Sequence, residues 1–276
     1  AIIALVGRGD EVLISDNVYW PTRKSCDELL QRFGVSIRYF DPGLGADIAP
    51  LIRPQTRLIY LESPGSVTFE VSDVPAICQA AKAAGCLTAI DNTWATPLGF
   101  DAVGHGVDIV IHAATKYLVG HSDAMLGLVS ATGPVLQRLR EGAMQLGHSV
   151  SPDDCALALR GLRTLAVRLD QHTRSALQVC QWLSEQPEVE ELLFPPWPGD
   201  TGHGRRRGGE RARRSTVRAA KSSASASVKA TVRGSTPEVG VALNSAVGEA
   251  FDTLYELGHR HFGLVTISEP MTFRHL

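Results

Sequence analysis

The sequence lacks the features that mark membrane proteins and secreted disulfide scaffolds. Its apolar runs are all far shorter than the roughly 20 residues that a membrane-spanning helix needs, and no charged segment followed by an apolar run opens it. The five cysteines include no Cys-x-x-Cys pair and no spacing typical of a metal site; they are Cys26, Cys78, Cys86, Cys155 and Cys180. We therefore expect a reduced, cytoplasmic protein with no membrane contact and no metal.

Aromatic residues are few, at 6%, but 44% of the 276 residues are hydrophobic and only 20% are charged, so a sizeable core can be buried. The net charge of −2 is unevenly spread: residues 1–200 hold 15 basic and 23 acidic side chains, and the remainder hold 12 and 6. Arginine crowds residues 205–218, and Ser and Ala alternate over 222–227. Such a composition cannot bury a core, so we expect disorder over 201–237 and leave the fold of 238–276 open.

Short apolar strands alternate with amphipathic helices along the first 185 residues or so. The patterns predict helices over 1–6, 22–33, 73–84, 134–146 and 153–183, and strands over 11–14, 35–40, 57–61, 86–90 and 108–112. This alternation is typical of an α/β fold with a mostly parallel sheet flanked by helices on both faces.

In such sheets ligands bind beyond the carboxyl ends of the strands, where two residues have the right chemistry. Asp91 follows the strand over 86–90, and Lys116 follows the strand over 108–112. A strand-end Asp often caps a turn and a loop Lys is usually solvated. Together, however, they match pyridoxal phosphate (PLP) enzymes, in which a Lys forms a Schiff base and an Asp pairs with the pyridine nitrogen.

The segment Ala114-Thr-Lys-Tyr-Leu-Val-Gly-His-Ser-Asp123 resembles the cofactor-lysine signature of the cysteine and methionine metabolism family of PLP-dependent enzymes. Further segments agree in family order: Gly9-Asp-Glu-Val-Leu13, Asn17-Val-Tyr-Trp-Pro21, Glu62-Ser-Pro-Gly-Ser66, Ala89-Ile-Asp-Asn-Thr-Trp94 and Arg160-Gly-Leu-Arg-Thr-Leu165. The resemblance covers residues 1 to about 200 and implies the aspartate aminotransferase-like fold type I.

The resemblance also implies roles for four residues. Lys116 is similar to the Schiff-base lysine, which also moves the substrate's α proton, and Asp91 to the partner of the pyridine nitrogen. Tyr19 resembles the tyrosine that stacks on the cofactor ring. Thr115 resembles a ligand of the cofactor phosphate, although a Thr that stabilises a turn would look identical.

Other signature residues have less specific readings. Residues 121–123 are interpreted as loop architecture, and Trp94 as a wall of the pocket. Arg160 and Arg163 stand at positions i and i+3 of a predicted helix, where salt bridges are the commoner use.

Within the family the segments are most similar to bacterial cystathionine beta-lyases, because Ala113 stands where relatives more often have Ser. The implied reaction is β-elimination of L-cystathionine, a small sulfur amino acid, to homocysteine, pyruvate and ammonia. Cystathionine gamma-synthase or gamma-lyase activity is the alternative. The family also implies a homotetramer.

Measured against the family pattern, the sequence opens after a phosphate-binding turn and an arm that carries Tyr and Arg, and it departs from the pattern after Asp200. We therefore expect a truncated fold, with a PLP-binding domain over 1–162 and the start of a small domain over 163–200. An inactive remnant is a further alternative. Residues 203–233 hold ten basic side chains and one acidic, which would suit nucleic acid, although a solvated tract is the commoner use of such a composition.

Overall fold

The computed structural model describes residues 1–66, 68–187, 189–198, 200 and 229–232. Most of the tract that we predict to be disordered, all of 238–276 and nearly all of the basic tract 203–233 lie outside these residues. The chain divides into two compact units, Ala1–Val167 and Arg168–Leu276. The domain boundary predicted after residue 162 stays a prediction.

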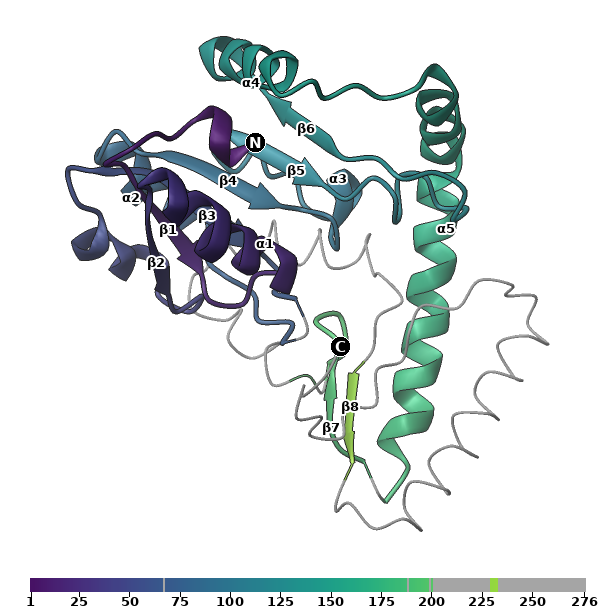
Figure 1. Ribbon diagram of the computed structural model, residues 1–276. Coiled ribbons are helices and arrows are strands. Elements are labelled where there is room, and N and C mark those ends of the chain that lie inside the picture. Colours follow the sequence, from purple (N-terminus) through teal and green to yellow (C-terminus); the bar gives the residue numbers. More distant parts are fainter. Residues whose placement is uncertain (67, 188, 199, 201–228, 233–276) are drawn as a thin grey trace. The chain divides into compact units, whose positions relative to one another are not determined.

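A six-stranded sheet forms the centre of the first unit (Figure 1). Its strands are β1 (Glu11–Ser15), β2 (Ser36–Phe40), β3 (Thr56–Glu62), β4 (Leu87–Asp91), β5 (Ile109–His112) and β6 (Leu128–Ala131), in the order β2-β1-β3-β4-β5-β6. The first five strands are parallel, and β6 pairs antiparallel with β5. The mostly parallel sheet confirms the predicted architecture, with β6 as a strand that the pattern did not predict.

Apolar side chains alternate between the two faces of the sheet, because successive residues of a strand point to opposite sides. One face carries Leu13, Ile59, Leu61 and Ile90 and packs against Ile77 of α2 (Val74–Ala83). The other face carries Val12, Ile14, Leu58 and Tyr60 and packs against Leu30 and Leu139. Both faces are therefore buried, which explains why the middle residues of the central strands are almost all apolar.

The helices begin and end near the predicted positions. The helix predicted over 22–33 begins earlier, as α1 (Trp20–Lys24), continues as the π-helix η2 (Ser25–Leu30) and the 3-10 turn η3 (Gln31–Phe33), and ends at Gly34 with φ 77°. The remaining elements of the first unit are η4 (Gly45–Leu51), α3 (Thr96–Gly99) and α4 (Gly133–Gln145).

The helix predicted over 1–6 is wrong in extent, since only a 3-10 turn, η1 (Ile2–Ala4), forms there. Six residues before a Gly-Arg-Gly turn provide too few hydrogen bonds to repay the cost of starting a helix.

Helix α5 (Pro152–Ser184) begins in the first unit and continues into the second. In the second unit Ala176, Cys180 and Leu183 are buried along the helix. Strand β7 (Val189–Leu193) pairs antiparallel with β8 (Lys229–Val232). Strand β8 lies inside the tract predicted to be disordered; its two β-branched residues suit a strand once a partner is present. Among the described residues no helix is both long and apolar enough to cross a bilayer.

Candidate active site

Three neighbouring parallel strands end in polar residues at one edge of the sheet. Strand β3 ends at Glu62, β4 at Asp91 and β5 at His112. Glu62 lies opposite Asp91 in the β3–β4 register, so both side chains stand on the same face. That face is the one covered by the helix that starts at Trp20. The carboxyl groups of Glu62 and Asp91 therefore lie side by side at the ends of β3 and β4.

Lys116 and Tyr19 meet at this edge from two different loops. The Nζ atom of Lys116 lies 5.2 Å from the centroid of the Tyr19 ring, within the range of a cation–π contact. Lys116 sits in a tight loop in which its N–H donates to the carbonyl of Ala113 at 3.0 Å and its carbonyl accepts from Gly120 at 2.8 Å. Tyr19 directly precedes α1 and is 46% exposed. An amine over an exposed aromatic face therefore borders the carboxyl pair.

Asp91 has one carboxylate oxygen engaged in a local turn, since its Oδ1 accepts from the Thr93 N–H at 2.9 Å. The Thr93 hydroxyl in turn accepts from the Ala113 N–H at 2.7 Å, which ties the loop after β4 to the loop that carries Lys116. Asp91 thus both caps a turn and faces the site. The two loops are held together by hydrogen bonds rather than by chance proximity.

Glu62 is the residue of this edge to which the sequence assigned no role. Its Oε2 accepts from the Tyr19 N–H at 2.7 Å. Burial and the neighbouring Asp91 raise the pKa of its carboxyl group to about 8, against the opposing effects of the Tyr19 N–H and Lys116. The available signal was its place directly after a predicted strand, beside the next strand end.

The hydroxyl of Thr115 forms its hydrogen bonds with the main chain of Leu126. Its Oγ1 donates to the Leu126 carbonyl at 3.3 Å and accepts from the Leu126 N–H at 3.0 Å. These bonds close the loop over 115–126. The phosphate-ligand role of Thr115 stays a prediction.

Signature residues around Lys116 support its loop. Arg160 forms an ion pair with Asp123, in line with the structural reading of both residues. A Cβ atom at Gly161 would lie 2.1 Å from the Val119 carbonyl oxygen, so only glycine lets α5 approach the lysine loop this closely. The indole of Trp94 packs edge-on against the Phe69 ring at 6.2 Å between centroids.

His112 is 3% exposed, and neither of its ring nitrogens has a hydrogen-bond partner among the described residues. Burial lowers the pKa of the imidazole, although the charge of Asp91 opposes that shift. His112 therefore favours the neutral form behind the site.

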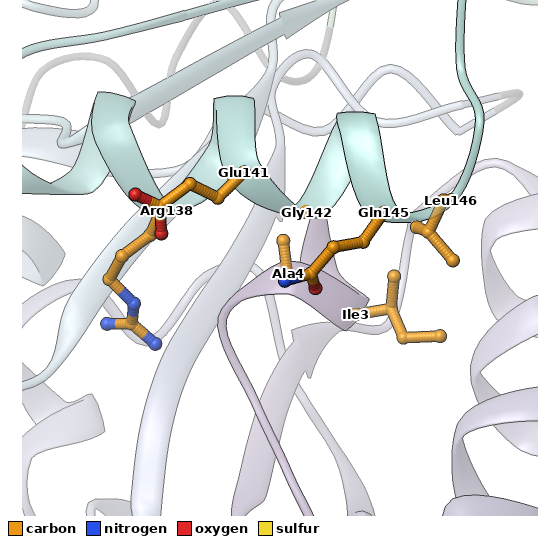
Figure 2. A pocket seen from close by; sticks show the side chains of 7 residues that line it. All are labelled: Ile3, Ala4, Arg138, Glu141, Gly142, Gln145 and Leu146. Carbon is orange, nitrogen blue, oxygen red and sulfur yellow. The ribbon is translucent and has the colours of Figure 1, made fainter.

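A cleft in the described part of the chain lies away from these residues. It has a volume of about 280 Å³ between η1 and α4, and Figure 2 shows its lining residues Ile3, Ala4, Arg138, Glu141, Gly142, Gln145 and Leu146. None of them belongs to the group of Glu62, Asp91, Lys116 and Tyr19 at the strand ends, called the strand-end cluster below. We therefore place the candidate active site at the sheet edge, where the reactive side chains lie, and not in this cleft.

Comparison with known proteins identifies the family of this chain. Residues 1–214 match the family described as Cys/Met metabolism PLP-dependent enzyme. The cystathionine beta-lyase of Escherichia coli is 45% identical over 74% of this chain and 52% of its own length. The L-alanine/L-glutamate racemase of Wolbachia pipientis is 39% identical over 74% of this chain and 50% of its own length.

A solved structure agrees with the fold. Cystathionine gamma-lyase from Lactobacillus plantarum, complexed with L-serine, matches with a TM-score of 0.76 and 29% identity over 84% of this chain and 58% of its own. The fold predicted from the sequence, fold type I, is thereby confirmed. The chain spans about half the length of the curated relatives named here.

The residues at the sheet edge fit the part of PLP that carries its chemistry. The aldehyde of PLP would need an amine such as Lys116, its pyridine nitrogen an acid such as Asp91, and its flat ring an aromatic face such as that of Tyr19. His112 does not take part in this fit, because the β4–β5 register places Ile111, and not His112, on the same face as Asp91.

Proposed function

Because the chain belongs to the Cys/Met metabolism family of PLP-dependent enzymes, we propose that it carries the cofactor site of a carbon–sulfur lyase that acts on L-cystathionine. The convergence of Lys116, Tyr19 and Asp91 at one sheet edge carries this proposal, since each supplies one contact that PLP requires. The overall reaction consumes L-cystathionine and water and releases homocysteine, pyruvate and ammonia.

Each residue has a separate task in this proposal. When bound, PLP supplies an electron-accepting ring conjugated with the substrate's nitrogen. Lys116 holds the cofactor's aldehyde carbon and later takes the α proton of the substrate at Nζ. Asp91 would place its carboxyl group beside the ring nitrogen, and Tyr19 would cover one face of the ring. The protein thereby contributes orientation and charge.

The relatives support the choice of β-elimination. Besides the Escherichia coli protein, cystathionine beta-lyases of Salmonella typhimurium and Haemophilus influenzae are each 43% identical to this chain. The proposed substrate is accordingly a small sulfur amino acid, the proposed assembly is the homotetramer of the family, and the proposed location is the cytoplasm.

Racemisation is a second candidate, favoured by the 39% identity to an L-alanine/L-glutamate racemase. Removal of the α proton by Lys116 is common to both reactions. They differ in the next event: elimination breaks the bond between the β carbon and sulfur, whereas racemisation returns a proton to the opposite face of the α carbon.

One assay separates these possibilities. The full chain with PLP is incubated with L-cystathionine and, separately, with L-alanine, and pyruvate, free thiol and D-alanine are measured, with Lys116→Ala as control. We expect pyruvate and thiol in equal amounts from L-cystathionine. Cysteine with 2-oxobutyrate in place of pyruvate would indicate γ-elimination, and D-alanine alone would indicate a racemase. Lack of every product would indicate an inactive chain.

A further inference from the structure

We propose that Glu62 is a positioning residue that holds Tyr19 opposite Lys116 by binding the Tyr19 main-chain N–H. This deepens the proposed function and rests on it in one respect only, namely that Tyr19 and Lys116 face the cofactor. The contact between Glu62 and Tyr19 is present without the cofactor.

The main chain of Tyr19 is held from both sides. Its N–H donates to Glu62 Oε2 at 2.7 Å, and its carbonyl accepts from Thr22 at 2.9 Å and from Arg23 at 3.2 Å. The carbonyl contacts start α1, which has no side-chain cap at its beginning. The carboxyl group of Glu62 thus ties the Tyr19 main chain at the start of this helix to the end of β3, and Tyr60 of the same strand adds a side-chain hydrogen bond with Thr22, one turn further on.

The surroundings of Glu62 favour its neutral form. Asp91 faces it from β4, Lys116 from the loop after β5, Tyr60 from its own strand and Tyr19 from the start of α1. Two carboxylates side by side in a half-buried site repel each other, and a proton on one of them removes the repulsion. Burial and the charge of Asp91 raise the pKa of Glu62 to about 8, so Glu62 carries the proton at neutral pH.

A neutral Glu62 keeps its task. One oxygen of a protonated carboxyl group still accepts a hydrogen bond, so the contact with Tyr19 survives. Glu62 therefore positions Tyr19 without adding a second negative charge beside Lys116. Glutamine imitates this state, because its amide is neutral and retains an acceptor oxygen, whereas alanine removes the acceptor.

The test is hydrogen–deuterium exchange at the Tyr19 amide, resolved by NMR on the full chain without cofactor. In Glu62→Ala we expect this amide to exchange at least about tenfold faster than in the unaltered chain, and in Glu62→Gln about as slowly. Glu28→Ala, which removes an exposed carboxyl group on η2, serves as the matched control and should change nothing. Circular dichroism establishes that each variant is folded.

A second measurement follows the attachment of PLP to Lys116. Borohydride labelling of Lys116 at limiting PLP should fall several-fold in Glu62→Ala and be restored in Glu62→Gln. Unchanged Tyr19 exchange in Glu62→Ala would overturn the proposal, as would a Glu62→Gln variant that behaves like Glu62→Ala. Failure of every form, the unaltered chain included, to be labelled would instead contradict the proposed function, while the exchange data would still decide the role of Glu62.

Discussion

Two carboxyl groups at opposite ends of the strands, the buried Glu11 and the half-buried Glu62, have opposite surroundings. Glu11, at the start of β1, is 2% exposed and has three partners: Thr56 at 2.6 Å, Arg38 at 2.9 Å and Arg53 at 3.5 Å. Burial raises the pKa of Glu11, but the hydrogen bonds of Thr56 and Arg38 and the charges of both arginines outweigh it and bring the pKa below its ordinary value. Glu62, at the end of β3, faces another carboxylate instead.

The different surroundings of Glu11 and Glu62 indicate that the first serves the stability of the fold and the second serves the candidate site. At the Glu11 end each buried charge is matched by hydrogen bonds, so the arrangement serves the fold. At the Glu62 end Asp91, Lys116 and Glu62 are held close without full compensation, and the pKa of Glu62 rises to about 8. Perturbed groups beside an amine are typical of functional sites.

The largest effect is expected at Lys116. Lys116→Ala should lower the rate of elimination by at least about 1000-fold, because it removes both the attachment point and the base. The stability of the fold should hardly change, since Lys116 is exposed. Steady-state pyruvate release checks the rate, and urea denaturation checks the fold. A rate within tenfold of the unaltered chain would contradict the assignment.

Glu11→Ala should produce the reverse pattern. We expect the free energy of unfolding to fall by about 3 kcal/mol, because Arg38 and Thr56 lose their buried partner. Lys116 labelling by PLP should remain. Asp170→Ala is the control, since it breaks an exposed i,i+4 pair with Arg174 and should cost only about 0.3–0.5 kcal/mol. Equal losses of unfolding free energy in Glu11→Ala and Asp170→Ala would contradict the stabilising role of Glu11.

Asp91→Asn tests the charge at the functional edge. A neutral amide keeps the size of the side chain but loses the ion pair with the ring nitrogen, so the affinity for PLP should fall by roughly 10- to 1000-fold. Absorbance titration with PLP measures the affinity. Unaltered affinity would mean that Asp91 serves only the turn with Thr93.

The pH dependence of stability should have opposite signs at the two ends. Glu62 keeps its proton in the folded chain up to about pH 8 but loses it near its ordinary 4.5 when unfolded. Between these values its contribution to the free energy of unfolding falls by about 1.4 kcal/mol per pH unit as pH rises. Glu62→Gln should therefore gain stability relative to the unaltered chain over this window, as followed by urea denaturation.

Glu11 supplies the opposite case. Because its pKa is lowered in the folded chain, its contribution is present above the ordinary value of 4.5 and is lost as pH falls toward the lower folded pKa. Glu11→Gln should flatten the acid limb of the stability curve and leave the limb near pH 8 unaltered. If Glu11→Gln and Glu62→Gln changed the pH dependence of stability over the same pH range, the opposite behaviour of the two carboxyl groups would be contradicted.

The smallest effect is expected at Thr115. Thr115→Val removes two hydrogen bonds with Leu126 and should lower the free energy of unfolding by about 1 kcal/mol, whereas Thr115→Ser should retain it. Comparing unfolding with PLP affinity then defines the role of the hydroxyl. A loss of affinity much greater than the loss of stability would support the phosphate contact.

How much the sequence predicted depended on whether the signal was local. The placement of Asp91 and Lys116 at one edge was predictable because parallel strands end there: Asp91 directly follows the predicted strand 86–90, and Lys116 stands four residues after the predicted strand 108–112. Tyr19 came only from the family resemblance, since nothing in its own neighbourhood places it near Lys116. Strand β6 escaped prediction because its four residues are mostly exposed and do not alternate between buried and exposed positions.

Glu62 shows the limit most clearly. An acidic residue at a strand end is ordinary in a sequence, and its importance here arises from the β3–β4 register and from the N–H of Tyr19, 43 positions away. Both are properties of the folded chain. A local pattern cannot encode them.

The most direct test of the central claim is borohydride reduction of the full chain with PLP, followed by peptide mass mapping. The account predicts that the cofactor becomes fixed to Lys116 and that Lys116→Ala removes this label. A label spread over other lysines, such as Lys24 and Lys82, and equally strong in Lys116→Ala would contradict it, since the strand-end cluster would then not form a cofactor site.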